Sequence, residues 1–106
     1  MFEPVCMIQG KSIENAKQDF RDAVRVEQYR VGREAIYLPQ GLRWMYIPYS
    51  QITRAEQSRR VISAGHCVTV REEKPAVDLI IGEETLTLNL EKADNAQTVL
   101  DAIRGR

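Results

Sequence analysis

The residue types best suited to metal binding or nucleophilic catalysis lie side by side in this chain. His66 is the only histidine, and it stands next to Cys67, one of two cysteines. A zinc site usually needs three or four protein ligands, and Cys6 is the only further thiol. Adjacent residues of a strand also point to opposite faces, which works against a Cys–His nucleophile pair. We therefore predict no metal, no cofactor and no catalytic residue here, and we expect both thiols to be reduced.

Acidic side chains form two adjacent pairs, Glu72-Glu73 and Glu83-Glu84. Paired carboxylates can act as general acid and base when burial tunes their pKa values. Both pairs fall in turn-like sequences, where solvent exposure explains them fully. The six glycines are scattered, and no glycine-rich phosphate loop is present. We predict that the protein is not an enzyme.

Three arginines are the candidates for anion binding. Arg30 and Arg33 flank Val31-Gly32, and Arg43 follows the next predicted strand. The planar guanidinium suits phosphate because it donates two parallel hydrogen bonds. Glu34 follows Arg33 at once, however, and three arginines make a sparse cluster, so a solvated turn is the competing interpretation.

An aromatic stretch, Trp44 to Ile52, organises the predicted fold. It reads as a buried strand that ends at Pro48, which lacks an amide hydrogen for the sheet ladder. The chain then turns a tight corner and returns to the core through Ile52. We expect Trp44 to be a core residue, and Tyr49 to be the aromatic that reaches the surface as a contact residue.

Composition and charge indicate one globular domain, residues 1–106. The chain is 43% apolar and 28% charged, with fifteen basic and fifteen acidic side chains. A net charge of zero argues against a dedicated nucleic-acid binder. The charge is uneven: residues 17–60 hold nine basic and five acidic side chains, whereas residues 61–106 hold five and eight. This asymmetry permits head-to-tail contacts, although ordinary surface charge also explains it.

The start of the chain and its hydropathy predict a cytoplasmic protein. No apolar run approaches the roughly 20 residues that cross a bilayer. Glu3 and Pro4 do not fit the basic-then-apolar plan of a signal peptide.

The hydrophobic periodicity predicts a helix, seven strands and a second helix. Ser12 is the expected cap of the first helix, with Ile13, Ala16 and Phe20 inward and Asp19 on the outer face. Asp94 is the expected cap of the second helix, which Gly105 ends. The predicted strands are residues 24–31, 35–38, 42–47, 52–60, 68–71, 77–81 and 86–90, with a turn at 72–75.

Seven antiparallel strands in a four-plus-three split, closed by one amphipathic helix, resemble the pleckstrin-homology-like (PH-like) fold. The Tyr46-Ile47-Pro48-Tyr49 corner followed by Ile52 is similar to the corner between the third and fourth strands of small bacterial PH-like domains. The strand Leu86-Thr87-Leu88, running into the Asp94 helix, fits the same ending. The resemblance covers residues 25–106. Residues 1–24 would be an added N-terminal arm and helix on this α+β, mainly β roll.

The resemblance suggests a non-enzymatic binding module that acts through protein–protein contacts or self-association as a homo-oligomer. Its exposed sheet edges could pair with another chain. The alternative is binding of anionic lipid or phosphoinositide headgroups, since lipid-binding PH domains hold them in the first hairpin loop, where we expect Arg30 and Arg33. The candidate binding residues are therefore Arg30, Arg33, Arg43 and Tyr49.

Overall fold

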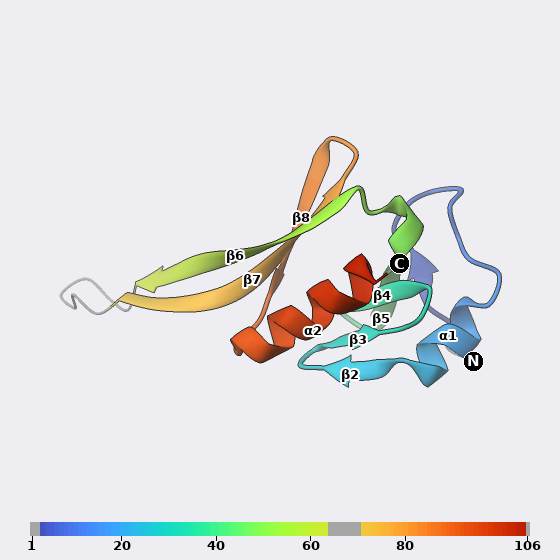
Figure 1. The fold of residues 1–106 in the computed structure, drawn as a ribbon. Coiled ribbons are helices and arrows are strands. Elements are labelled where there is room, and N and C mark those ends of the chain that lie inside the picture. Colours follow the sequence, from blue (N-terminus) through green and yellow to red (C-terminus); the bar gives the residue numbers. More distant parts are fainter. Residues whose placement is uncertain (1–2, 64–70, 106) are drawn as a thin grey trace.

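The computed structural model describes residues 3–63 and 71–105, which form two helices and two sheets of an α+β, mainly β fold (Figure 1). In chain order the elements are β1 (Val5–Cys6), α1 (Ala16–Asp22), β2 (Val24–Val26), β3 (Tyr29–Val31), β4 (Ala35–Gln40), β5 (Arg43–Pro48), the 3-10 helix η1 (Tyr49–Gln51), β6 (Arg54–Ser63), β7 (Arg71–Ile81), β8 (Glu84–Asn89) and α2 (Ala93–Arg104). Neither helix in this part of the chain has the length and apolar character needed to cross a bilayer.

The larger sheet has the strand order β1-β5-β4-β3-β2. Its four consecutive strands β2 to β5 form an antiparallel meander. The short strand β1 adds to the outer edge of β5 in parallel, with Val5 opposite Met45 and Cys6 opposite Tyr46. The N-terminal segment is thus tied into the sheet by backbone pairing.

The smaller sheet has the order β6-β7-β8, and its β6–β7 hairpin extends well beyond the part that pairs with β8. β6 and β7 pair from Arg54 opposite Ile80 to Ser63 opposite Arg71, whereas β8 pairs only with the Ala76–Ile81 part of β7. The hairpin projects from the body (Figure 1), which fits the overall dimensions of 51 × 29 × 25 Å. We call the projecting part, residues 57–63 and 71–75, the arm.

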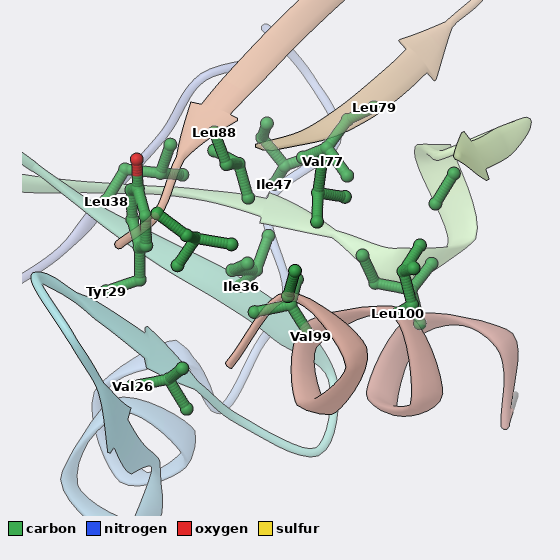
Figure 2. Packing of buried hydrophobic residues seen from close by; sticks show 14 of the residues in the cluster. Val26, Tyr29, Ile36, Leu38, Ile47, Val77, Leu79, Leu88, Val99 and Leu100 are labelled. Carbon is green, nitrogen blue, oxygen red and sulfur yellow. The ribbon is translucent and has the colours of Figure 1, made fainter. Parts of the chain in front are cut away.

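The main core lies where the two sheets and α2 meet (Figure 2). Among the described residues, fifteen buried ones form it. The larger sheet contributes Val26, Tyr29, Ile36, Leu38 and Ile47, the 3-10 helix Tyr49, the smaller sheet Ala55, Val77, Leu79 and Leu88, the segment after β8 Leu90, and α2 Ala96, Val99, Leu100 and Ile103. Burial of each larger aliphatic side chain stabilises the fold by about 1.5–3 kcal/mol. The predicted apolar stripe of the second helix is confirmed.

A second cluster covers the opposite face of the larger sheet, under α1. Ala16 of α1 and Tyr37 and Tyr46 of the sheet are buried in it. The Phe20 ring centroid lies 5.2 Å from that of Tyr37 and 5.2 Å from that of Trp44. Trp44 therefore packs as predicted, but against α1 and only half-buried.

The predicted corner at Pro48 is confirmed. β5 ends at Pro48, η1 makes the turn, and the Tyr49 amide donates to the Glu34 carbonyl oxygen at 2.9 Å. Ile47 is fully buried, and Ile52 packs at the margin of the main core. The proline ends the strand and lets both isoleucines reach the same core.

Two predicted boundaries in the first sheet are wrong. Residues 24–31 form two strands, since Glu27 adopts a left-handed conformation, with φ of 56°, and makes a tight turn between β2 and β3. Residues 24–31 therefore contain one strand more than predicted. The strand predicted at 52–60 pairs with β7, so it belongs to the smaller sheet as β6.

The turn predicted at residues 72–75 is also wrong, because β7 runs straight through Pro75. The Pro75 carbonyl oxygen accepts a hydrogen bond from the Leu90 amide at 3.1 Å, so its nitrogen also points away from β6. The missing N–H therefore costs no bond to β6. The strand predicted at 68–71 lies almost wholly outside the described residues.

Candidate functional site

The structure does not bring the predicted arginines together. Arg33 is exposed in the turn between β3 and β4, and Arg43 is exposed at the start of β5. Since Ala35 pairs with Pro48 and Gln40 with Arg43, the length of β4 separates these two arginines. The turn predicted at Gly32-Arg33 is present between β3 and β4, but an earlier hairpin turns at Glu27 and Gln28, so this turn is not the first hairpin, and Arg30 lies within β3.

Arg30 has an internal role instead of projecting from a loop. Its guanidinium carbon lies 4.7 Å from the Phe20 ring centroid and 5.5 Å from that of Trp44. Such cation–π contacts stabilise by about 0.5–2 kcal/mol. The Arg30 Nε is buried without a hydrogen-bond partner among the described residues. The side chain therefore covers the aromatic cluster under α1.

Tyr49 does not reach the surface, so its predicted role as an exposed contact is wrong. It is 6% exposed, and its hydroxyl donates to the Gly32 carbonyl oxygen at 2.7 Å. Its backbone amide also donates to the Glu34 carbonyl oxygen at 2.9 Å, so both the main chain and the side chain of Tyr49 are bound to the β3–β4 loop. Tyr49 thus links two loops of the larger sheet.

A buried carboxylate is the polar centre of the α1 interface. Asp19 is 5% exposed and accepts hydrogen bonds from the Tyr37 hydroxyl and the Arg33 amide, both at 2.8 Å, and from the Glu34 amide at 3.2 Å. Burial, together with this hydrogen bond and the Asp19 charge, raises the pKa of Tyr37. The Asp19 oxygens face groups of the fold itself, so the cluster positions α1 on the β3–β4 turn.

Asp19 was expected on the outer face of the helix, and that expectation is wrong. The sequence held a usable signal, since Asp19 lies three residues after Ala16 and four before Ala23, within the apolar stripe. Gly32 completes the arrangement, because a Cβ at this position would collide with the Asp19 carboxylate.

A second carboxylate, Glu27, ties the β2–β3 turn to the residues that lead into α2. It accepts hydrogen bonds from the Glu91 amide at 2.7 Å, the Lys92 amide at 3.1 Å and the Asn95 side-chain amide at 2.8 Å. Burial raises its pKa, but these bonds and the Lys92 charge outweigh that effect and hold the pKa below its usual value. Asp94 was expected to cap this helix, but Lys92 is the cap residue and makes no side-chain cap bond.

The arm borders a polar groove of about 530 Å³. Residues of β6 and β7 and the first residue of α2 line it: Gln57, Ser58, Arg59, Glu73, Lys74, Pro75 and Ala93. Across it, Arg59 Nη1 lies 3.1 Å from Glu73 Oε2, with both side chains more than half exposed. Ion pairs so exposed contribute little stability, so these charges remain accessible to another chain.

The backbone of β6 presents an open edge along the arm. Pro75 points its backbone groups toward β8, and it lies opposite Arg59. Directly paired residues of an antiparallel ladder share the same orientation, so the Arg59 N–H and C=O point away from β7. The same orientation recurs at alternate residues, namely Ala55, Gln57, Val61 and Ser63.

Only the inner end of this edge is covered. Arg104 of α2 donates from Nη2 to the Ala55 carbonyl oxygen at 2.9 Å, which confirms the outward orientation. In the described part of the chain, no further strand pairs with β6 on this side. The outward backbone groups of Gln57 and Arg59 are therefore available to an added strand.

Comparison with protein-family models, with curated proteins and with solved structures finds no match for this chain. The described residues contain no cluster of three His, Cys, Asp or Glu side chains placed to hold a metal ion. His66 and Cys67 lie outside the described residues, and the Cys6 thiol donates to the Ile8 carbonyl oxygen at 3.2 Å.

Proposed function

We propose that this protein is a non-enzymatic binding module, which uses the arm to pair with another protein chain. The observation that carries the proposal is the open edge of β6, where backbone N–H and C=O groups point outward beyond the body. Unpaired strand edges are templates for β-strand addition, in which main-chain hydrogen bonds supply affinity. A two-stranded ribbon is only marginally stable alone, so an added strand would also stabilise the arm.

We further propose that the fold is a PH-like roll with added N-terminal elements. Support comes from the four-strand meander β2–β5, the three-strand meander β6–β8 and the closing helix α2, with β1 and α1 as additions. Two carboxylates, the buried Asp19 and the partly exposed Glu27, support a scaffold rather than a catalytic site, because they bind groups that hold elements together. Lipid headgroup binding has less support, since the three arginines are dispersed and a carboxylate occupies the first hairpin turn.

The proposal is tested by shortening the arm. Replacing residues 59–75 with Asn-Gly joins Ser58 to Ala76 through a tight two-residue turn, which suits the hydrogen-bonded pair there. We expect unchanged thermal unfolding of the body and loss of self-association or of a captured partner, measured by sedimentation and pull-down. Association that is equal in both proteins would overturn the proposal. Sedimentation with acidic vesicles that is abolished by Arg33→Glu would overturn it in favour of headgroup binding.

A further inference from the structure

We infer that the chain added to β6 is a second copy of this protein, in an antiparallel dimer whose two-fold axis passes beside Ser58. The inference rests on the proposed function and specifies its partner. Two copies of one edge strand can pair only in antiparallel orientation around a two-fold axis, and each possible axis position fixes a complete register.

The outer edge of β6 offers an added strand more backbone hydrogen-bonding groups than the outer edge of β7 does. Beyond the end of β8, the outward positions of β7 are Pro75, Glu73 and Arg71, and Pro75 has no N–H to donate. On β6 the outward series from Gln57 to Ser63 has a donor and an acceptor at each position. An added strand therefore gains a more complete ladder on β6.

Charge selects one register along this edge. With the axis at Ser58, Glu56 of each copy lies opposite residue 60 of the other, which is an arginine. Within its own chain the Glu56 carboxylate also lies 3.0 Å from Arg54 Nε, an exposed contact that a second arginine can share. Gln57 then lies opposite Arg59, and these two residues exchange two hydrogen bonds at each of two symmetric places. Opposite charges directly across an antiparallel pair stabilise it, whereas like charges oppose it.

The neighbouring registers are less favourable. Axes at residues 56, 59 and 60 place Glu56, Arg59 and Arg60, respectively, opposite their own copies, and an axis at residue 57 places Arg54 opposite Arg60. An axis at residue 61 opposes no like charges, but it leaves only residues 59–63 of the described strand to overlap. The Ser58 register combines the longer overlap with two complementary charge pairs.

A single-cysteine scan tests the register in the full-length chain. In a Cys6→Ser, Cys67→Ser background, cysteines are placed one at a time at residues 57 to 61, with Glu83→Cys in the β7–β8 turn as control. Directly opposed Cα atoms lie about 4.5–5.5 Å apart, within the range that disulfides span. Mild oxidation should cross-link Ser58→Cys most efficiently. A maximum at another position would overturn the inferred register.

Proline and charge variants test the edge and its chemistry. Gln57→Pro removes an outward N–H from β6 and should abolish the dimer, while Glu73→Pro removes an outward N–H from β7 and should leave it. Glu56→Arg should raise the dimer dissociation constant about tenfold or more, and adding Arg60→Glu should restore it, since two symmetric charge pairs are affected.

Analytical ultracentrifugation separates failure of this inference from failure of the proposed function. A chain that stays monomeric at high concentration, yet loses a bound foreign protein when the arm is shortened, would overturn the dimer and support the proposed function. A dimer unaffected by Gln57→Pro and by the shortened arm would overturn both.

Discussion

Replacing Asp19 with alanine should detach α1 from the larger sheet. The carboxylate accepts bonds from the fully buried Tyr37 and from the amides of Arg33 and Glu34. Hydrogen bonds to a charged group contribute roughly 1.5–3 kcal/mol each. The two loop amides can regain water, whereas the Tyr37 hydroxyl cannot do so easily. We therefore expect Asp19→Ala to lower the free energy of unfolding by about 3 kcal/mol.

The only tryptophan supplies the assay, because Trp44 packs on Phe20 of α1. Urea unfolding is followed by Trp44 fluorescence and by far-ultraviolet circular dichroism. In Asp19→Ala the fluorescence transition should move to lower urea than the circular dichroism transition, which reports both sheets. Asp19→Asn keeps the shape and an acceptor oxygen, so its loss should be about 1 kcal/mol.

Asp22→Ala is the matched control, since Asp22 is an exposed acid at the end of the same helix. Its loss should stay within about 0.5 kcal/mol. An Asp19→Ala protein as stable as Asp22→Ala, with coincident transitions, would refute the assignment of Asp19 as the polar anchor of α1.

Three further substitutions test the other polar contacts. Glu27→Gln should cost about 1 kcal/mol at neutral pH by weakening the bonds to the residues that lead into α2. Because the native pKa of Glu27 is lowered, this contribution is present above the unfolded pKa and is lost as the pH falls through the folded pKa. The acid titration of stability should therefore be flatter in the variant, and parallel curves would contradict this role of Glu27. Gly32→Ala should lower the free energy of unfolding by about 2 kcal/mol or more, since the new Cβ displaces the Asp19 carboxylate. In a double-mutant cycle, the same change in an Asp19→Ala background should cost clearly less. Arg30→Met should leave stability unchanged or raise it by about 1 kcal/mol, because the change removes a buried unpaired Nε but keeps an apolar chain over Phe20. A loss above about 2 kcal/mol in thermal unfolding would show that the cation is essential there.

Local patterns in the sequence were enough to predict the corner at Pro48 and the buried stripe of α2. Both depend on rules that act within a few residues: a missing donor ends a strand, and apolar side chains three or four apart share one helix face. The alternation of Leu86 and Leu88 likewise marked β8.

The polar contacts could not be found in the same way, because their partners are distant in the chain. Glu27 binds the segment before a helix that begins more than sixty residues later, and no local spacing encodes that approach. Asp19 left a trace in its helical position, but its partners lie in the β3–β4 turn and on β4. The turn predicted at Pro75 is wrong because a proline interrupts a sheet only when its missing N–H faces a neighbouring strand. Which side of a strand lacks a neighbour is known only from the sheet order.

β8 ends opposite Ala76 of β7, so the outer part of the arm has no third strand beside it and its length can vary independently of the core. Pro75 and Lys74 still contact Leu90 and Glu91. From Val61 outward, in the part of the chain that the structure describes, each β6–β7 pair has no further strand beside it, so pairs can be added or removed there without repacking the body. Side chains alternate between faces, so changes of two pairs preserve orientation and alter the reach by about 6.5 Å.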